Sequence, residues 1–255
     1  MRNYKGPRFW FRYLDLLHML KDHRLDLDIL EIGSGTLELA AELAKDHNVT
    51  CIDLSSDLKN IYMELPPEQK KKITCIQGDF MGYDFQKQKY DVVIALEVLE
   101  HIEEEELFLN KVKEITRKNS SVYLSVPAHM SLWSKHDEMV GHQRRYEKSD
   151  INRFKKIFKD SELLVRAYGW PWINILRLLR IASSSVLYKD AKSLSMEDRS
   201  VKSGMRLKKL SILSFLSNKY VLYPFWIFSR LFVMTDLSEG YLVEITRGVC
   251  STEQS

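Results

Sequence analysis

Apolar runs of five to seven residues alternate with helix-like periodic segments along the first half of the chain. Because these runs are short, rich in β-branched residues and bounded by polar or turn residues, we expect them to form strands. The expected strands are residues 26–32, 48–53, 73–77, 90–96 and 121–126, and the expected helices between them are residues 37–46, 57–64 and 103–117. Strands that alternate with helices of this length form βαβ units and a mostly parallel sheet.

The pattern loosens after the fifth expected strand. Residues 127–148 are predicted to be a long loop, rich in His, Arg and aromatic side chains, and a helix is expected at 150–159. Two more strands are expected, one near 163–167 and the last at 241–246. The sequence therefore predicts an α/β fold with a Rossmann-like, doubly wound sheet. That sheet is mostly parallel, its last strand runs antiparallel, and a helical insertion precedes this strand.

The predicted domain organisation has three parts. Residues 1–25 are expected to form an N-terminal helical lid, and residues 26–168 with 240–249 the core. Residues 169–239 are too many for a structureless loop inside a compact domain, so we expect them to form a helical cap or docking element.

Charge is distributed unevenly over a chain of otherwise ordinary globular composition. The 255 residues are 45% apolar and 29% charged, with a net charge of +3. Residues 165–235, however, hold 12 Lys or Arg against three Asp or Glu, among many aromatic and aliphatic residues. This segment predicts contact with an anionic partner or an anionic membrane surface; alternatively, it is a helical subdomain whose solvated face is basic.

Neither a targeting segment nor a metal motif is evident. No apolar run reaches the roughly 18 to 20 residues that span a bilayer, and the charged start is not typical of a secretory signal. Cys51, Cys75 and Cys250 show no metal-ligand spacing and are expected to be reduced thiols, the first two buried. We expect a cytoplasmic protein that can associate with a membrane surface, and no metal site.

The first expected strand runs into a glycine turn of the kind that binds nucleotides. Gly33 and Gly35 allow a sharp turn and a close approach of the backbone to a ligand. Asp53 ends the second strand 20 residues after Gly33, where a carboxylate can accept hydrogen bonds from both ribose hydroxyls. The GxGxxG pattern of dinucleotide sites needs glycine where this chain has Glu38, whose charge would repel a pyrophosphate. Glu31 can instead hold a positively charged methionine amino group.

The third expected strand ends in Gly78-Asp79-Phe80. An amine-binding carboxylate and an aromatic ring therefore reach the carboxyl edge of the sheet, which is where ligands bind in open α/β folds. Together with the glycine turn and Asp53, these residues favour an adenosine-containing cofactor without phosphates.

Four segments in this order, LEIGSGTLELA, CIDLS, QGDF and DVVIALEVLEHI, resemble the motifs of class I methyltransferases that depend on S-adenosyl-L-methionine, in particular the small-molecule branch with the ubiquinone-biosynthesis O-methyltransferases. The resemblance covers about residues 26–126. It implies S-adenosyl-L-methionine as the cofactor. The implied contacts are Glu31, Gly33 and Gly35 at the methionine end, Asp53 at the ribose, Leu54, Asp79 and Phe80 at the adenine, and Leu96 and Glu97 beside the sulfonium. Many members have a further glycine in place of Leu37.

A second stretch resembles a bacterial methyltransferase subgroup associated with glycan or secondary-metabolite pathways. It comprises SVPAH at 125–129, LWS at 132–134 and GHQRRY at 141–146. The resemblances imply methyl transfer but do not settle the acceptor. We expect this acceptor to be a hydroxyl, amine or carboxylate of a small-molecule metabolite, or of a lipid-linked one that the basic, aromatic insertion reaches at a membrane. Because a pair of arginines lies in this stretch, an acceptor that carries negative charge is one candidate.

Methyl transfer is an in-line displacement, so the enzyme chiefly aligns the nucleophile and excludes water. A hydroxyl acceptor also needs a base, usually a histidine. The candidates are His136, Asp137, His142 and Tyr146, with His142 as the base or orienting group and Asp137 as its partner. In the alternative, hydrogen bonds from these residues brace the loop.

Several alternative interpretations of these residues and of the function stay open. Arg144 and Arg145 either bind an anionic acceptor through their planar forks or brace the loop, and His101 is expected to be structural. The alternative functions are a non-catalytic binding protein with the same fold and a dinucleotide-dependent oxidoreductase. Nucleic acid is not an expected partner, because residues 96–98 are Leu-Glu-Val where base amino-methyltransferases carry a Pro-Pro-aromatic motif.

Overall fold

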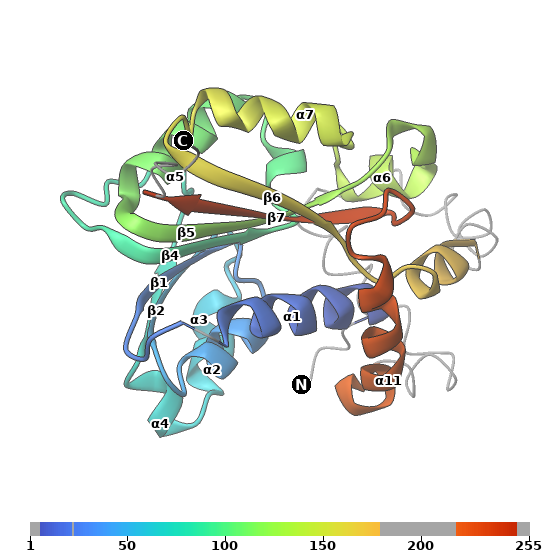
Figure 1. Cartoon of the computed structure of the whole chain (residues 1–255). Coiled ribbons are helices and arrows are strands. Elements are labelled where there is room, and N and C mark those ends of the chain that lie inside the picture. The colour runs from blue at the N-terminus through green and yellow to red at the C-terminus, as the bar shows by residue number, and fades with distance from the viewer. Residues whose placement is uncertain (1–5, 22, 179–217, 249–255) are drawn as a thin grey trace. The chain divides into compact units, whose positions relative to one another are not determined.

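A single sheet of seven strands organises the computed structural model, which describes residues 6–21, 23–178 and 218–248. Its strand order is β3-β2-β1-β4-β5-β7-β6 (Figure 1). The strands are β1 (Asp28–Ile32), β2 (Asn48–Asp53), β3 (Ile73–Gln77), β4 (Tyr90–Leu96), β5 (Thr116–Pro127), β6 (Ser161–Ala167) and β7 (Gly240–Arg247). All seven strands expected from the sequence are therefore present, and the predicted Rossmann-like class is confirmed.

The described helices are short. They are α1 (Pro7–Leu20), α2 (Glu38–Leu43), α3 (Leu58–Met63), α4 (Pro67–Lys70), α5 (Glu105–Ile115), α6 (Lys135–Val140), α7 (Lys148–Asn152) and α11 (Lys219–Ser229). Single turns of 3-10 helix are η1 (Leu99–His101), η2 (Met130–Leu132), η3 (Arg153–Lys156) and η6 (Arg230–Phe232). Residues 172–178 are helical as well.

Strand direction follows the prediction. β1 pairs in parallel with β2 and with β4, β2 with β3, and β4 with β5. β7 runs the other way, because the Tyr168 amide donates to Gly240 while the Gly248 amide donates to Asp160, so that residue numbers rise on one strand as they fall on the other (Figure 1). The expected antiparallel last strand is thus confirmed.

The central strands are mostly apolar because both faces of the sheet are covered. Residues Val92 to Ala95 of β4 are fully buried, as are Ile29 and Leu30 of β1. Figure 1 shows α2, α3 and α4 on one side of the sheet and α5 and α7 on the other. This sandwich holds the carboxyl ends of β1 to β4 at one edge.

Two expected boundaries near β5 are wrong. The helix predicted to reach residue 117 ends at Ile115, and β5 begins at Thr116, well before the expected position 121. The register between β4 and β5 shifts near the start of β5, and Asn119 takes a positive φ of 57°. The polar residues at 117–119 hid this irregular start, because they break the apolar pattern that marks a strand.

The segment predicted as a long loop, residues 127–148, contains structure of its own. It includes η2 and the helix α6, which begins with a capping box in which Ser134 and Asp137 bond each other's backbone amides. Gly141 ends α6 in the left-handed region at φ 83°. The predicted helix at 150–159 is also corrected, because α7 starts at Lys148 and gives way to η3 after Asn152.

Contacts within the chain gather into two compact units. The first unit comprises Met1–Lys21, Val126–Glu147 and Arg166–Leu242, and the second Asp22–Ser125, Lys148–Val165 and Val243–Ser255. Residues 179–217 of the expected insertion and Cys250 lie outside the described residues. The division into a lid, a core and a cap at 1–25, 26–168 with 240–249, and 169–239 stays a prediction.

Within the first unit, α1 packs against α11 through a buried polar contact. Leu222, Trp226 and Ser229 form the buried stripe of α11, at the spacing of one helix face. The Trp226 indole N–H donates to the carboxyl group of Asp15 on α1 at 2.8 Å. Burial raises the pKa of Asp15 to about 7, although the hydrogen bond from Trp226 and the nearby charge of Arg230 counteract it.

This raised pKa predicts how stability depends on pH. The folded pKa of Asp15 lies above its ordinary value of 3.8, so the fold favours the protonated carboxyl group. Its contribution to the free energy of unfolding is therefore greatest below about pH 4 and is lost as the pH rises to about 7. We expect Asp15→Asn, which keeps an acceptor for Trp226, to stabilise the protein at pH 8 by up to about 4 kcal/mol.

The measurement is urea unfolding at pH 5 and pH 8. Asp57→Asn, which changes an exposed carboxylate, is the control and should leave the pH dependence as in the wild type. An Asp15→Asn variant with the wild-type loss of stability between these two pH values would contradict the assignment.

Candidate functional site

The turn between β1 and α2 needs glycine at its first position. Gly33 has a φ of 71°, and a Cβ atom there would come within 2.6 Å of the Val98 side chain. Gly35 has a φ of 52° but open space around it, so its requirement is conformational. Leu37 also takes a positive φ, 60°, and buries its side chain completely. The turn is thus a tight, left-handed path fitted against the residue that follows β4.

Asp53 holds this turn from the neighbouring strand. Its Oδ2 accepts a hydrogen bond from the Gly35 amide at 2.7 Å, and its Oδ1 accepts one from the Ser55 amide at 2.8 Å. Each carboxylate oxygen keeps a further lone pair that can accept from a ligand hydroxyl. Leu54, the next residue, is 66% exposed and presents an apolar side chain beside the carboxylate.

Glu31 lies inside the sheet, directly across from the thiol of Cys51. Glu31 is buried and is the register partner of Cys51 on β2, which in turn is the register partner of Cys75 on β3. Hydrogen bonding with Cys75, burial and the charge of Glu31 all raise the pKa of the Cys51 thiol. Cys51 is a buried free thiol as predicted, whereas Cys75 is only half-buried.

Asp79 and Phe80, which follow β3, differ in their exposure to solvent. Asp79 is exposed, and its Oδ1 accepts from the Met81 amide at 3.0 Å. Phe80 is buried, and its ring packs on Phe85 and Phe108 with centroids 5.6 and 5.1 Å away. The Phe80 ring therefore packs in this aromatic cluster, and its place beside the cofactor stays a prediction.

Glu97 follows β4 in a strained conformation that Ser125 supports. Its φ is 57°, and its amide donates to both the carbonyl oxygen and Oγ of Ser125, at 3.0 and 3.1 Å. Ser125 Oγ donates in turn to Glu97 Oε1 at 3.1 Å. The fully buried Ser125 was not singled out from the sequence, because a serine inside a strand gives no signal of this pairing.

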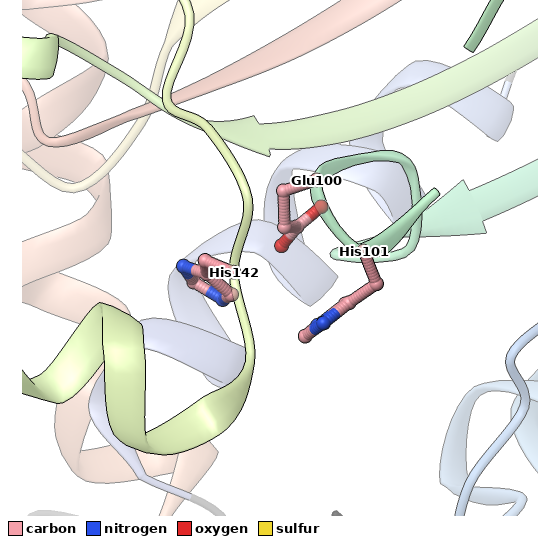
Figure 2. Close-up of side chains that lie close together, drawn as sticks. All are labelled: Glu100, His101 and His142. Atoms are coloured by element: carbon pink, nitrogen blue, oxygen red, sulfur yellow. The ribbon is translucent and has the colours of Figure 1, made fainter. Parts of the chain in front are cut away.

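The turn η1 carries two further polar side chains, Glu100 and His101 (Figure 2). Glu100 is fully buried, and the His101 amide donates to Val98 at 3.0 Å. Val98 thus takes part in both turns, since its side chain also limits Gly33. Burial of Glu100 was not expected from the sequence.

In the first unit, Asp137 collects hydrogen bonds from three side chains. Its Oδ1 accepts from His142 Nδ1 at 3.0 Å and from Arg145 Nε at 2.9 Å. Its Oδ2 accepts from Ser134 Oγ at 2.8 Å. Figure 2 shows the His142 ring on the segment that follows α6. The predicted pairing of His142 with Asp137 is therefore present in the structure.

Asp137 is a buried anion held by a cation. Burial alone would raise its pKa, but the hydrogen bonds from His142, Arg145 and Ser134 and the charge of Arg145 together place the pKa far below its ordinary value. The carboxylate therefore stays ionised. It accepts a hydrogen bond from Nδ1–H of His142, which in the neutral ring fixes the tautomer whose lone pair is on Nε2.

The other candidates near α6 have different surroundings. The Arg145 guanidinium is almost fully buried and donates to the Asp137 carboxylate and the Ala128 carbonyl oxygen, contacts that favour the bracing role. Tyr146 is buried, and its backbone bonds Pro127 and His129. His136 is half-buried on α6.

Directly after β5, His129 lies in a group of polar side chains that was not predicted from the sequence. His129 has a φ of 61°, and its Nδ1 is 2.9 Å from Glu147 Oε2 while its Nε2 is 3.1 Å from the Asp236 carbonyl oxygen. The Tyr241 hydroxyl bonds the Asp236 carboxylate, and burial followed by this contact raises the pKa of Tyr241. The feature that distinguishes His129 is its positive φ, which a sequence does not show.

Comparison with known proteins identifies part of the chain. The profile of the methyltransferase domain family matches residues 29–119. Residues 29–119 are a class I methyltransferase domain. The predicted class and, with it, the predicted cofactor, S-adenosylmethionine, are confirmed for this domain.

Curated relatives match about two fifths of this chain. The ubiquinone biosynthesis O-methyltransferase of Rickettsia bellii (strain OSU 85-389) is 34% identical over 103 residues, 40% of this chain and 42% of that protein. The mitochondrial ubiquinone biosynthesis O-methyltransferase of Schizosaccharomyces pombe is 29% identical over 128 residues, 43% of this chain and 46% of that protein. The chain thus spans less than half the length of the curated relatives it matches.

Solved structures extend the likeness in fold. Phosphoethanolamine N-methyltransferase 2 of Haemonchus contortus, in complex with S-adenosyl-L-methionine, gives a TM-score of 0.59 at 16% identity, over 96% of this chain and 54% of that chain. The methyltransferase domain of bacterial CtHen1-C gives 0.56 at 16% identity, over 94% and 98%. The [4+2]-cyclase SpnF gives 0.56 at 11% identity, over 95% and 82%. At these identities the likeness concerns the fold.

Proposed function

We propose that this chain transfers the methyl group of S-adenosylmethionine to an acceptor on a small-molecule or lipid-linked metabolite. The observation that carries the proposal is the hydrogen bond between the Asp53 carboxylate and the glycine turn, within a methyltransferase domain. The Asp53 carboxylate accepts from the Gly35 amide at 2.7 Å, so a group that could accept from ribose hydroxyls lies beside the turn.

The surroundings of the turn suit a cofactor without phosphates. Glu38 is the first residue of α2, and Thr36 Oγ1 donates to its carboxylate. A negative charge thus lies at the helix N-terminus, where a dinucleotide would seat its pyrophosphate. Glu31, Glu97 and Asp79 add carboxylates near the strand ends and would hold the ammonium, sulfonium and adenine amine of S-adenosylmethionine.

His142 and Asp137 are the proposed base and its partner for a hydroxyl acceptor. The Asp137 carboxylate orients the ring and stabilises the imidazolium that forms when Nε2 takes the acceptor's proton. Asp137 itself is fully buried, so it acts through His142. For an amine or carboxylate acceptor, His142 would orient the acceptor and would not need to remove a proton. Tyr146 is a weaker candidate because it is buried. His136 also remains a candidate.

A non-catalytic protein with the same cofactor site is the alternative function. The likeness to the [4+2]-cyclase SpnF favours keeping it, because that protein has a related fold and another printed activity. Measured methyl transfer, or its absence with a bound cofactor, separates the two.

We expect S-adenosylmethionine and S-adenosylhomocysteine to stabilise the protein and NADH not to. A ligand at about 100 times its dissociation constant adds roughly 2.7 kcal/mol to the free energy of unfolding, which raises the melting temperature by several degrees. Asp53→Asn should weaken binding of both ligands at least about tenfold, because an amide cannot accept from Gly35 and a ribose hydroxyl with the same atoms.

Thermal-shift titration measures this, with Asp57→Asn as the matched control on a nearby exposed carboxylate. Stabilisation by NADH instead would indicate the oxidoreductase, and no shift with any ligand would contradict the proposed cofactor site.

The second expectation concerns His142→Ala. With phenols, amines and carboxylic acids screened for release of S-adenosylhomocysteine, the variant should lose about 10²- to 10⁴-fold in kcat on a hydroxyl acceptor. Its affinity for S-adenosylmethionine should stay unchanged, because His142 belongs to the acceptor side. Gln143→Ala, at the exposed neighbouring position, is the control. Normal turnover by His142→Ala would leave this histidine a bracing role.

We further propose that an anionic membrane surface is the partner of the insertion. Ten large apolar side chains are exposed in the described part of residues 169–239, and we call them the aromatic surface: Ile175, Leu178, Tyr220, Tyr223, Phe225, Ile227, Phe228, Leu231, Met234 and Leu237. Monomeric proteins rarely expose so many large apolar groups together.

The charge of this region fits the headgroups of anionic lipids. The insertion is strongly basic in sequence, with 12 Lys or Arg against three Asp or Glu over residues 165–235. Aromatic side chains among cations are typical of segments that lie in the membrane interface. Among the described residues, none of the helices has the length and apolar character of a bilayer-spanning segment. A cytoplasmic location stays a prediction.

Binding to vesicles that contain about one third phosphatidylserine in phosphatidylcholine tests this partner. We expect co-sedimentation at low salt and a large loss of binding in Tyr220→Glu with Leu231→Glu, because these are the most exposed members of the aromatic surface, at 77% and 75%. Leu25→Glu is the matched control, since Leu25 is 68% exposed in the other unit. Failure to bind anionic vesicles, or self-association that the double variant abolishes, would contradict the proposal.

A further inference from the structure

A hollow of about 520 Å³ lies in the second unit, at the end of the sheet opposite to the glycine turn. β4 and β5 begin at this end, and β7 finishes there because it runs antiparallel (Figure 1). Five cationic side chains line the hollow, together with a single carboxylate from Glu114: Lys89, Lys113, Arg117, Lys118 and Arg247.

One of the five cations is already neutralised. Arg117 pairs with Asp28 at 2.8 Å and with Asp91 at 2.6 Å. These carboxylates raise the pKa of Arg117 and would compete with any added anion for its donors. The remaining positive charge of the hollow therefore comes from the three lysines and Arg247.

Arg247 is the group whose charge lacks compensation. Its guanidinium donates to the carbonyl oxygens of Lys113, at 2.7 Å, and of Thr116. In the described part of the chain these neutral oxygens are its partners, and no carboxylate is paired with it. Burial accordingly lowers the pKa of Arg247, which expresses the cost of keeping an unpaired guanidinium away from water.

The lysines follow the same pattern. Lys113 Nζ donates to the Ile157 carbonyl oxygen at 2.5 Å, and Lys89 Nζ donates to the Glu114 carbonyl oxygen. Cations at the C-terminus of α5 stabilise its last carbonyl groups. Neutral carbonyl oxygens, however, do not cancel unit charges, so four cations remain gathered around one carboxylate and repel one another.

We propose that this hollow is a second binding site and that it takes a small phosphate-bearing anion such as pyrophosphate or tripolyphosphate. A guanidinium with ammonium groups beside it provides the paired and point-like donors that phosphate oxygens accept from. A polyphosphate would also remove the mutual repulsion, and the hollow has room for more than one phosphoryl group.

Calorimetric and thermal-shift titrations of the full chain with pyrophosphate and with tripolyphosphate test the site. Sodium chloride at matched ionic strength separates specific binding from screening. We expect a melting temperature that rises with either phosphate, and at least about tenfold weaker binding in Arg247→Gln and in Lys118→Gln, since each removes one charge from the site. Lys59→Gln, at an exposed lysine on α3, should bind as the wild type does.

Lys118 is exposed, so Lys118→Glu provides a variant whose folding does not depend on the half-buried Arg247. No phosphate-dependent stabilisation of the wild type would overturn the proposal. Equal binding by the wild type and all three variants of the hollow would overturn it as well, because it would locate the anion elsewhere, for instance on the basic insertion. Competition by S-adenosylhomocysteine would likewise move the site to the opposite edge. Each readout is independent of methyl transfer.

Discussion

The space between Gly33 and Val98 constrains the rest of the cofactor edge. A side chain at position 33 would lie 2.6 Å from the Val98 methyl group, so the chain turns after β1 only if glycine is there. That turn presents the Gly35 amide to Asp53, which ends the next strand. Val98 also accepts the amide hydrogen bond that closes the turn η1. One steric contact therefore couples three strand ends: displacing Val98 would loosen the glycine turn and the segment that carries Glu97.

Asp137 has a comparable role in the segment after β5. A carboxylate buried without partners would be strongly destabilising, yet this one accepts bonds from Ser134, His142 and Arg145. The same contacts begin the helix α6, fix the His142 tautomer and tie Arg145 to the Ala128 carbonyl oxygen. Bracing and catalysis are therefore compatible roles for this network, because an oriented base requires a rigid partner.

The sequence predicted most of the fold, since buried parallel strands are short apolar runs and the glycine turn follows the first of them. It failed where local polar contacts replaced apolar periodicity. The pattern of Ser134 and Asp137, three residues apart and followed by Gly141, is a helix signal that a search for apolar spacing passes over. The irregular start of β5 around Asn119 has no apolar pattern at all. The burial of Phe80 against Phe108 was not predicted either, because the partner ring is far away in the sequence.

Among site residues, those attached to a turn were predictable and those that support them were not. Asp53 and Gly35 have fixed positions in a βα unit, so their spacing predicts contact. Ser125 and His129 act through tertiary neighbours that are far away in the sequence. The backbone strain of Glu97 and His129, both at positive φ, is visible in the structure alone.

The sheet divides its charges between its two ends, and this division has a consequence for turnover. Glu31, Asp53, Asp79 and Glu97 gather carboxylates where the parallel strands end, whereas Lys113, Lys118 and Arg247 gather cations where they begin. In the proposed reaction the cofactor arrives with a positive sulfonium and leaves as a neutral thioether. The acidic edge therefore attracts the cofactor more strongly than its product, and most of this difference would be expected from Glu97, the carboxylate expected beside the sulfur. A neutral side chain at position 97 would then weaken the binding of S-adenosylmethionine more than that of S-adenosylhomocysteine. Loss of Asp53, whose proposed partner is the unchanged ribose, would weaken the binding of both alike.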